Sequence, residues 1–324
     1  MKPQAAPSAV VFGGAGFIGR HLAHALVARG APRVALYDIA PPRWAMTPEM
    51  TFERCDVRDP IDRGAPAAPV QVFNLAAIHR TPGHEDREYH ETNERGARHV
   101  TDFCERHGVA DLWFTSSIAV YGPSEAAVTE STPPRPSSAY GRSKANAEAI
   151  HAEWARAAPG RRLVIVRPGT VFGPGEGGNF TRLAWALARR RFAYPGRRDT
   201  IKACGYVGDL VESLLFMQRH ADPVVTYNFS YDPPPTIEEV CAAFAEVGGL
   251  PRPLGTVPLP LVVGAARVLY RAGLESFRPE RVEKLNRSTN VRPRLLAELG
   301  FPYPTRLRTG LAAWRDAEPA GEFV

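Results

Sequence analysis

Near its start the chain reads Gly13-Gly14-Ala15-Gly16-Phe17-Ile18-Gly19. The apolar run before it, Ser8 to Phe12, is typical of a short buried strand, and the segment Phe17 to Arg29 carries apolar residues at helical spacing. A strand, a glycine turn and a helix in this order start a βαβ unit. Glycines here let the backbone approach a pyrophosphate, whose charge the helix N-terminus stabilises. The stretch predicts a dinucleotide-binding turn, with a glycine turn that holds no ligand as the alternative.

Strand and helix patterns alternate beyond this turn. The apolar runs predict further strands at residues 33–37, 51–55, 70–75, 111–115 and 163–166, and helical patterns lie at residues 85–107, 139–158 and 179–191. This alternation predicts a mainly parallel sheet covered on both faces, which is the α/β, Rossmann-type doubly wound fold.

The pattern loosens after Pro168, which suggests two regions. We expect residues 1–168 to form the dinucleotide-binding domain and residues 169–324 to form a smaller, mostly helical C-terminal substrate lobe. Residues 203–230 include another apolar run, at 224–229, and are expected to rejoin the first domain. A ligand would bind between such lobes by default.

The composition argues against several classes of protein. Of 324 residues, 44% are hydrophobic and 23% charged, as in a globular protein. The longest uncharged apolar stretch, Val257 to Ala266, is far shorter than the roughly 20 residues that span a bilayer. The N-terminus lacks the apolar core of a secretory signal, so we expect a cytoplasmic protein. The net charge of +6, without long basic blocks, argues against a nucleic-acid partner.

The spacing of the cysteines argues against a metal site. The spacing between cysteines contains no CxxC pair, so we expect buried thiols and no metal site. The four cysteines are Cys55, Cys104, Cys204 and Cys241.

Asp38 ends the second predicted strand, about 20 residues after the last glycine of the turn. A carboxylate at this position accepts hydrogen bonds from an adenosine ribose and repels a 2′-phosphate. NAD is therefore favoured over NADP, although Arg43 nearby leaves NADP open. The alternative is that Asp38 merely caps a helix or turn.

Tyr140 and Lys144 form a Y-x-x-x-K pair at the start of a predicted helix, which places both side chains on one face. A phenol with a pKa near 10 is a poor base at neutral pH, but an adjacent ammonium favours the phenolate. Such a pair can exchange a proton with an alcohol or a ketone, and an exposed helix pair is the alternative. Ser116 and Ser117 close the strand at residues 111–115, where open α/β sheets bind ligands.

Several further motifs occur in a characteristic order. These are Asp56-Val57-Arg58-Asp59, Asn74-Leu75-Ala76-Ala77, Thr115-Ser116-Ser117, Val120-Tyr121-Gly122, Tyr140-Gly141-Arg142-Ser143-Lys144 and Arg167-Pro168-Gly169. Together with the glycine turn they extend over about half of the chain. The pattern resembles the extended short-chain dehydrogenase/reductase family and, within it, the NAD-dependent sugar-nucleotide epimerase/dehydratase branch.

The resemblance implies NAD as the cofactor and assigns roles to residues of the motifs. Asp56 and Val57 are implied at the adenine, and Asn93 near the nicotinamide half. Together with the turn and Asp38, the expected cofactor-binding set is Gly13, Gly16, Phe17, Ile18, Gly19, Asp38, Asp56, Val57, Leu75, Ala76, Ala77, Asn93, Tyr140, Lys144 and Pro168. The implied catalytic trio is Ser117, Tyr140 and Lys144, with Ser116 as a neighbouring strand residue.

Departures from the family pattern narrow the range of activities that the resemblance implies. The family's 4,6-dehydratases carry an acidic pair directly after the serine or threonine that corresponds to Ser117. This chain has Ile118-Ala119 at those positions, which argues against dehydration. Lys202 replaces an arginine that pairs with the nucleotide diphosphate in many epimerases. Asn179 matches a position near the sugar diphosphate. We take Ser117, Asn179 and Lys202 as candidate substrate-binding residues; the alternatives are a helix N-cap for Asn179 and a solvated surface lysine for Lys202.

The leading hypothesis is an NAD-dependent epimerase that inverts C4 of a diphosphate-activated hexose or N-acetylhexosamine through a keto intermediate. The rival is a keto-sugar reductase on the same scaffold, and a non-catalytic dinucleotide sensor is more remote. The sugar carrier is a nucleotide or, as in one branch that the chain resembles, a polyprenyl diphosphate. We expect a homodimer. Residues Pro258 to Leu274 could form a peripheral membrane contact; the alternative is that this helix packs on the C-terminal lobe. We do not count His79 among the catalytic residues.

Overall fold

The computed structural model describes residues 7–67, 70–79, 83–220, 222–274, 279–318 and 323. The chain forms two compact units. Unit 1 comprises Met1–Gly122, Pro134–Arg167 and Val211–Tyr227, and unit 2 comprises Pro123–Pro133, Pro168–Leu210 and Asn228–Val324. The observed division differs from the expected boundaries at residues 123–133, 203–210 and 228–230, which belong to unit 2, as does Pro168.

A seven-stranded sheet has the order β11-β7-β5-β4-β1-β2-β3, and its five neighbouring pairs from β7 to β3 are parallel. The strands are β1 (Ser8–Phe12), β2 (Val34–Asp38), β3 (Met50–Arg54), β4 (Val70–Asn74), β5 (Asp111–Thr115), β7 (Arg162–Pro168) and β11 (Val224–Phe229). The order reverses between β1 and β4. Open α/β sheets bind ligands at the carboxyl ends of the strands beside such a reversal.

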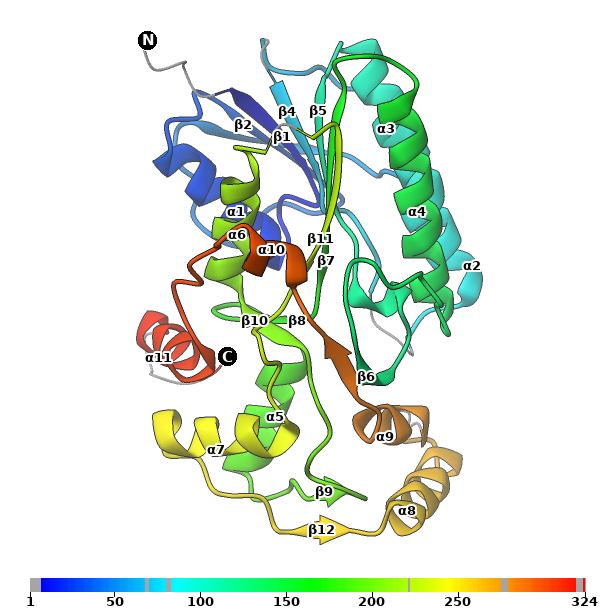
Figure 1. Cartoon of the computed structure of the whole chain (residues 1–324), viewed down its shortest axis with the longest axis vertical. Coiled ribbons are helices and arrows are strands. Elements are labelled where there is room, and N and C mark those ends of the chain that lie inside the picture. The colour runs from blue at the N-terminus through cyan, green and yellow to red at the C-terminus, as the bar shows by residue number, and fades with distance from the viewer. Residues whose placement is uncertain are drawn as a thin grey trace. The chain divides into compact units, whose positions relative to one another are not determined.

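Helices cover both faces of this sheet. Figure 1 shows α3 and α4 on one side of it and α1 and α6 on the other. The helical segments are α1 (Phe17–Ala28), α2 (Asp86–Tyr89), the π-helix η1 (His90–Arg95), α3 (Gly96–Arg106), the short 3₁₀-helix η2 (Ile118–Val120), α4 (Ala139–Arg156) and α6 (Val207–Met217). The helix predicted over residues 85–107 is thus interrupted by a π-helical stretch.

Aromatic side chains fill the layer between the sheet and α3. Phe103 packs edge-on against Phe12 and Tyr37, with ring centroids 5.3 Å and 6.2 Å apart. Phe103 and Phe12 are fully buried. Burial of such rings on the apolar stripe of α3 fixes the helix against β1 and β2.

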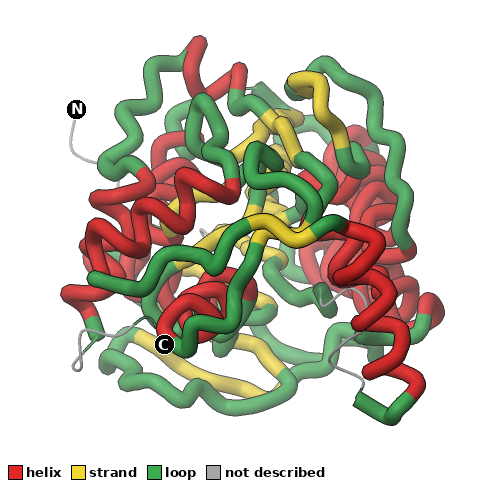
Figure 2. Tube along the Cα trace, turned by 90° about the horizontal axis from the view of Figure 1, so that it is seen from below, coloured by secondary structure: helices red, strands yellow, loops and turns green. Residues whose placement is uncertain are grey.

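Unit 2 contains short strands and most of the remaining helices (Figure 2). Its two-stranded sheets are β10-β8, β12-β9 and β13-β6. Its elements are β6 (Ser124–Val128), β8 (Thr170–Phe172), α5 (Asn179–Ala188), β9 (Tyr194–Pro195), β10 (Cys204–Tyr206), α7 (Ile237–Gly248), β12 (Thr256–Val257), α8 (Leu259–Arg271), α9 (Pro279–Leu285), β13 (Thr289–Val291), α10 (Arg294–Glu298) and α11 (Leu307–Ala317). The pairing of β6 with β13 explains why residues 123–133 belong to unit 2.

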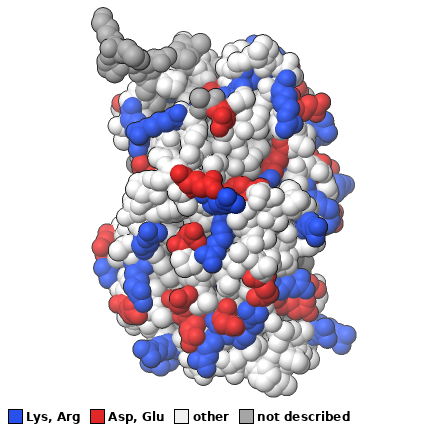
Figure 3. All heavy atoms as spheres, viewed as in Figure 1, with Lys and Arg blue, Asp and Glu red and all other residues white. Residues whose placement is uncertain are grey.

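All four cysteines are buried and free, as expected. Burial raises the pKa of each thiol, so none is an activated nucleophile. Within the described ranges, no cluster of three or more His, Cys, Asp or Glu side chains could hold a metal, and no helix is long and apolar enough to cross a membrane. Acidic and basic side chains are interspersed over the face drawn in Figure 3.

Candidate active site

The glycine turn of unit 1 is tightly built. Gly13 has a φ of +75°, and a Cβ added there would lie 2.7 Å from the amide nitrogen of Ala76. A Cβ at Gly19 would lie 2.6 Å from the carbonyl oxygens of Gly13 and Gly14. Larger residues would therefore push the turn away from the end of β4. The close packing brings the expected cofactor segments Gly13–Gly19 and Leu75–Ala77 together.

The start of α1 supplies the anion-binding part of the turn. Gly16 is the N-cap, no side chain caps the helix, and its first turn contains no acidic residue. Uncapped amides at a helix N-terminus favour a bound phosphate. Phe17 and Ile18 are the first two residues of this helix, so the residues present fit the pyrophosphate of a dinucleotide.

Asp38 lies at the end of β2 and contacts this turn directly. Its carboxylate accepts hydrogen bonds from the amide of Ala15, at 3.0 Å, and from that of Ile39, at 2.7 Å. Burial raises the pKa of Asp38, and the backbone amides oppose that rise. The carboxylate thus steadies the turn and still has lone pairs for a ribose.

Asp38→Asn should reduce the preference for NAD over NADP by at least about tenfold, because it removes a charge that repels the 2′-phosphate. Calorimetric titration of both dinucleotides measures the ratio of dissociation constants. Asp102→Asn, which removes an exposed acid on α3, is the matched control and should leave the ratio unchanged. Tighter NADP binding by the unmodified protein would contradict the expectation.

The residues expected at the adenine lie just after β3. The Asp56 carboxylate pairs with Arg58 at 2.6 Å, and this hydrogen bond lowers the pKa of Asp56. Val57 is buried beneath Gly96, where an added Cβ would lie 2.8 Å from a Val57 methyl group. The Val57 carbonyl contacts His99 at 2.8 Å. The segment is held in place by contacts that the spacing of the motif did not reveal.

Asn93 is buried in the π-helix and hydrogen-bonds both Ile78 and Ser143 of α4. Its Oδ1 accepts from the amide of Ile78 at 3.2 Å, and its Nδ2 donates to the Ile78 carbonyl at 3.3 Å and to Ser143 Oγ at 2.8 Å. It therefore ties the chain after Ala77 to α4. The role near the nicotinamide stays a prediction, since these bonds explain its burial without a ligand.

The expected catalytic trio assembles within unit 1. Ser117 follows β5 and hydrogen-bonds Tyr140 through its side chain, and its Oγ also accepts from the amide of Ala119 at 3.1 Å. Lys144 is 2% exposed and donates to the Thr115 carbonyl at 2.8 Å. Ser138 caps α4 by accepting from the amide of Gly141 at 3.1 Å, which fixes the turn that carries Tyr140.

Burial is the largest influence on the pKa values of both Tyr140 and Lys144. Burial raises the pKa of Tyr140 to about 12, and the hydrogen bond from Ser117 opposes the rise. Burial lowers the pKa of Lys144 to about 7, and the charge of Glu148 opposes that fall. The Lys144 ammonium lies on the Thr115 carbonyl, and the lowering of the Tyr140 pKa by Lys144 stays a prediction.

A buried ion pair between Glu148 and Arg167 was not predicted from the sequence. Glu148, one turn after Lys144 on α4, pairs with Arg167 at the end of β7, with oxygen-to-nitrogen distances of 2.6 Å and 2.8 Å. Ser116 donates to the same carboxylate at 2.5 Å, and Arg167 also donates to the Tyr121 hydroxyl at 2.8 Å. Ser116 is therefore a member of this network, which distinguishes it from Ser117.

Two more buried groups border the trio. His151 stacks on Phe114, its Nδ1 lies 2.6 Å from the Ala147 carbonyl, and burial lowers its pKa to about 4. Its neutral ring therefore donates from Nδ1 and accepts from the Asn74 amide at 3.1 Å. Thr115 Oγ1 is buried without a hydrogen-bond partner among the described residues.

The remaining predicted residues belong to unit 2, apart from His79. Asn179 is exposed and is the first residue of α5, so the alternative that it caps the helix is wrong. The N-cap is Gly178, and the Glu176 carboxylate accepts hydrogen bonds from the amide of Thr181, at 3.0 Å, and from its hydroxyl, at 2.8 Å. Pro168 ends β7, and His79 is exposed.

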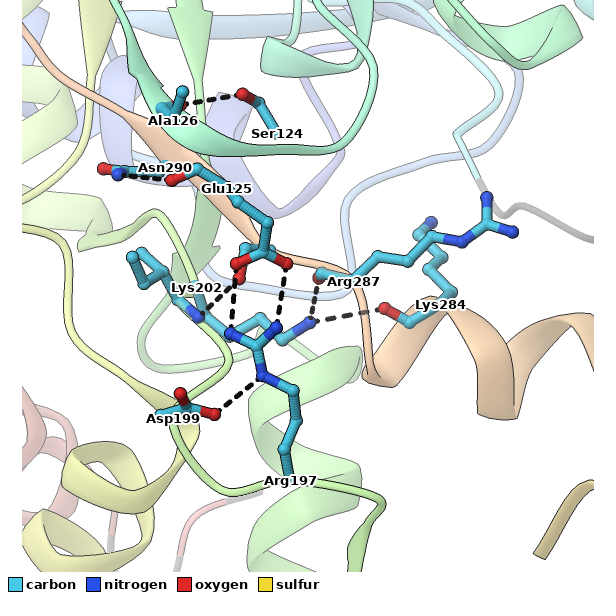
Figure 4. Close-up of polar contacts among 11 residues, drawn as sticks. Ser124, Glu125, Ala126, Arg197, Asp199, Lys202, Lys284, Arg287 and Asn290 are labelled. Atoms are coloured by element: carbon cyan, nitrogen blue, oxygen red, sulfur yellow. Dashed lines mark hydrogen bonds and ion pairs between the residues drawn. The ribbon is translucent and has the colours of Figure 1, made fainter. Parts of the chain in front are cut away.

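Lys202 is not a freely solvated lysine. Its ammonium donates to the carbonyls of Arg287, at 2.8 Å, and Lys284, at 3.3 Å, at the C-terminal end of α9 (Figure 4). Burial lowers the pKa of Lys202 to about 8. Arg197 lies beside it and clamps both Glu125 carboxylate oxygens. The ammonium keeps one donor for a substrate phosphate.

Comparison with known proteins agrees with this geometry. The sequence pattern of the NAD dependent epimerase/dehydratase family matches residues 9–229. The chain belongs to this family. The Rossmann-type fold, the place in the extended short-chain dehydrogenase/reductase family and NAD as cofactor, all expected from the motifs, are confirmed.

Two relatives and one solved structure show how far the likeness reaches. N-acetyl-alpha-D-glucosaminyl-diphospho-ditrans,octacis-undecaprenol 4-epimerase of Escherichia coli O157:H7 is 30% identical over 256 residues, covering 78% of this chain and 76% of that protein. 4-Hydroxy-2-methyl-3-oxo-4-farnesyl-3,4-dihydroquinoline-1-oxide ketoreductase of Stigmatella aurantiaca is 26% identical, covering 96% and 97%. MoeE5 in complex with UDP-glucuronic acid and NAD is 26% identical, with a TM-score of 0.74 and coverage of 94% and 97%.

Proposed function

We propose that this family member is an NAD-dependent epimerase that inverts C4 of a diphosphate-activated hexose or N-acetylhexosamine. The observation that carries the proposal is the trio in unit 1, where Ser117 hydrogen-bonds Tyr140 and Lys144 is anchored on the strand end at Thr115. A hydroxyl, a phenol and an ammonium so placed can move one proton to and from a sugar oxygen. The 4-epimerase relative supports the choice of C4.

In this mechanism the Tyr140 oxygen removes the proton of the sugar hydroxyl and later returns it. Ser117 donates a hydrogen bond to the reacting oxygen and steadies the charge that develops there. Lys144 favours the phenolate by its positive charge, which Glu148 helps to maintain by raising the Lys144 pKa. When bound along Gly13–Gly19 and Asp38, NAD supplies reversible hydride transfer at the same carbon.

Elimination of water fits the site less well. Dehydration needs an acid and a base next to the reacting carbon, in addition to the tyrosine. The two residues after Ser117 are Ile118 and Ala119, which begin the short helix η2 and carry no titratable group. This supports epimerisation over dehydration.

The carrier of the sugar is part of the proposal. The relative from Escherichia coli is named for an undecaprenyl-diphosphate-linked sugar, and MoeE5 is solved with UDP-glucuronic acid. Both carriers present a diphosphate, for which Lys202 and Asn179 of unit 2 are the candidate partners. We place the enzyme in surface-polysaccharide or glycoconjugate assembly, as a homodimer in the cytoplasm.

A keto-sugar reductase is the second candidate, favoured by the ketoreductase relative that matches nearly the whole chain. It would use Ser117, Tyr140 and Lys144 once in each turnover. The difference is that a reductase consumes reduced cofactor, whereas an epimerase regenerates its NAD in every cycle.

The protein as purified should carry NAD and should epimerise UDP-N-acetylglucosamine, or the polyprenyl-diphosphate-linked sugar, without net consumption of cofactor. The measurements are the dinucleotide released by denaturation and the ratio of epimers in the product. Tyr140→Phe is the negative control for activity. Loss of reduced-nicotinamide absorbance in step with product would overturn epimerisation and favour the reductase.

A further inference from the structure

Large apolar side chains are exposed on two neighbouring segments of unit 2, residues 177–198 and 248–274. Nine large hydrophobic residues are exposed in the described part of the chain, and six of them lie on these segments. Leu254 and Val268 are each 67% exposed. The six are Trp185, Leu254, Leu261, Val268, Tyr270 and Leu274. Such a concentration on the surface marks an interaction site more often than scattered apolar residues do.

The same two segments are strongly basic. Residues 177–198 contain six arginines and residues 248–274 contain three, and neither segment contains Asp or Glu. Arg197 and Arg198 pair with acids elsewhere in unit 2. The other seven are exposed and form no ion pair with any described residue. These seven are Arg182, Arg189, Arg190, Arg191, Arg252, Arg267 and Arg271.

Backbone hydrogen bonds join the two segments side by side. β9 pairs with β12, and the amide of Leu254 donates to the carbonyl of Phe192 at 2.9 Å, next to the arginine run at 189–191. α8 follows β12 directly, and Figure 1 draws β9, β12 and α8 together at its lower end, from which Figure 2 is viewed. We call the exposed residues of both segments the basic apolar surface.

Helix α8 shows how this surface is organised. Val263 and Ala266 are buried on the inner side of the helix, which packs against α9. Leu261, Ala265 and Val268 recur at helical spacing and are exposed. Arg267 and Arg271 lie one turn apart beside them and are also exposed. On α5, Arg189 stacks 5.6 Å above the exposed ring of Trp185.

We propose that the basic apolar surface docks on an anionic lipid bilayer. Amphipathic helices with arginine beside leucine, tryptophan and tyrosine lie in the interface, where apolar groups enter the acyl boundary and cations meet the phosphates. Exposed leucine and valine between the arginines distinguish this surface from one built for nucleic-acid phosphates alone. The inference goes beyond the epimerase chemistry, because docking is a property of unit 2 whatever the trio of unit 1 catalyses.

Sedimentation with vesicles tests the proposal. The full-length protein should sediment with phosphatidylcholine vesicles that contain phosphatidylglycerol, less so as salt is added, and not with phosphatidylcholine alone. Arg267→Glu with Arg271→Glu should weaken partitioning by at least roughly 30-fold, since each basic residue near an anionic surface contributes about fivefold. Leu261→Ser with Val268→Ser should also weaken it, by removing the apolar insertion.

The matched control is Arg33→Glu with Arg219→Glu, which makes the same change in net charge at exposed positions of unit 1. It should bind vesicles like the unmodified protein. Equal loss in the control, no sedimentation of the unmodified protein, or tighter binding to duplex DNA than to vesicles would each overturn the proposal. Melting temperatures of all variants and their turnover of UDP-N-acetylglucosamine, measured without lipid, separate this failure from a failure of the proposed epimerase.

Discussion

Tyr140→Phe should lower turnover by a factor on the order of 10² to 10⁴ while NAD binding and the melting temperature stay near those of the unmodified protein. The substitution removes one oxygen, whose hydrogen-bond partner is Ser117, and leaves the ring in place. Steady-state turnover, calorimetric titration of NAD and thermal unfolding measure the three quantities on one preparation.

Tyr227→Phe is the matched control for this experiment. Tyr227 is fully buried in unit 1 and shares a hydrogen bond of 3.1 Å with Ser213, so the change removes the same atom away from the trio. Its turnover should remain close to normal. Activity of Tyr140→Phe within about threefold of the unmodified enzyme would remove Tyr140 from the proton-transfer role.

Glu148→Gln should lower the free energy of unfolding by about 3 to 5 kcal/mol, because it leaves the Arg167 guanidinium buried without a counter-charge. The two side chains are 9% and 8% exposed, so solvent screens the pair little. Urea unfolding at neutral pH measures the loss. The control is Glu153→Gln, an exposed acid on the same helix, which should change stability by no more than about 0.5 kcal/mol.

The same variant tests whether Glu148 positions the catalytic pair or only stabilises the fold. Burial lowers the pKa of Lys144 to about 7, and the Glu148 charge opposes that fall. Without that charge the ammonium is lost at a lower pH, so the basic limb of the kcat/KM profile should move to lower pH. A loss of stability below about 1 kcal/mol, or an unmoved limb, would contradict the respective part of this expectation.

The parts of the site that are formed by residues close together in the sequence could be predicted from the sequence. The glycine turn, the strand end at Asp38 and the helical spacing of Tyr140 and Lys144 are all short-range features, and their placement in the structure follows from them. Ser117 could be chosen over Ser116 only with the help of the family motif. The structure supplies the physical difference, since Ser116 donates to Glu148 and Ser117 bonds Tyr140.

Contacts between distant segments could not be predicted in the same way. Glu148 and Arg167 lie on different elements, and nothing in the spacing shows that a helix and a strand end will bring them together. Lys202 illustrates the same limit, because its carbonyl partners are more than 80 residues away in sequence. The anchoring of Lys144 was likewise not foreseen, since its ammonium donates to the carbonyl of Thr115 on another element.

The repeated passage of the backbone between the two units has a consequence for synthesis on the ribosome. β11, at Val224–Phe229, is the last strand of the large sheet to leave the exit tunnel, and β7 has an unpaired edge until then. Likewise β6 has no partner until β13, at Thr289–Val291, is made. Exposed strand edges on a nascent chain invite aggregation. A fragment that ends near residue 168 therefore lacks β11 and β13, and both strand edges have their partners only when nearly all of the chain has been translated.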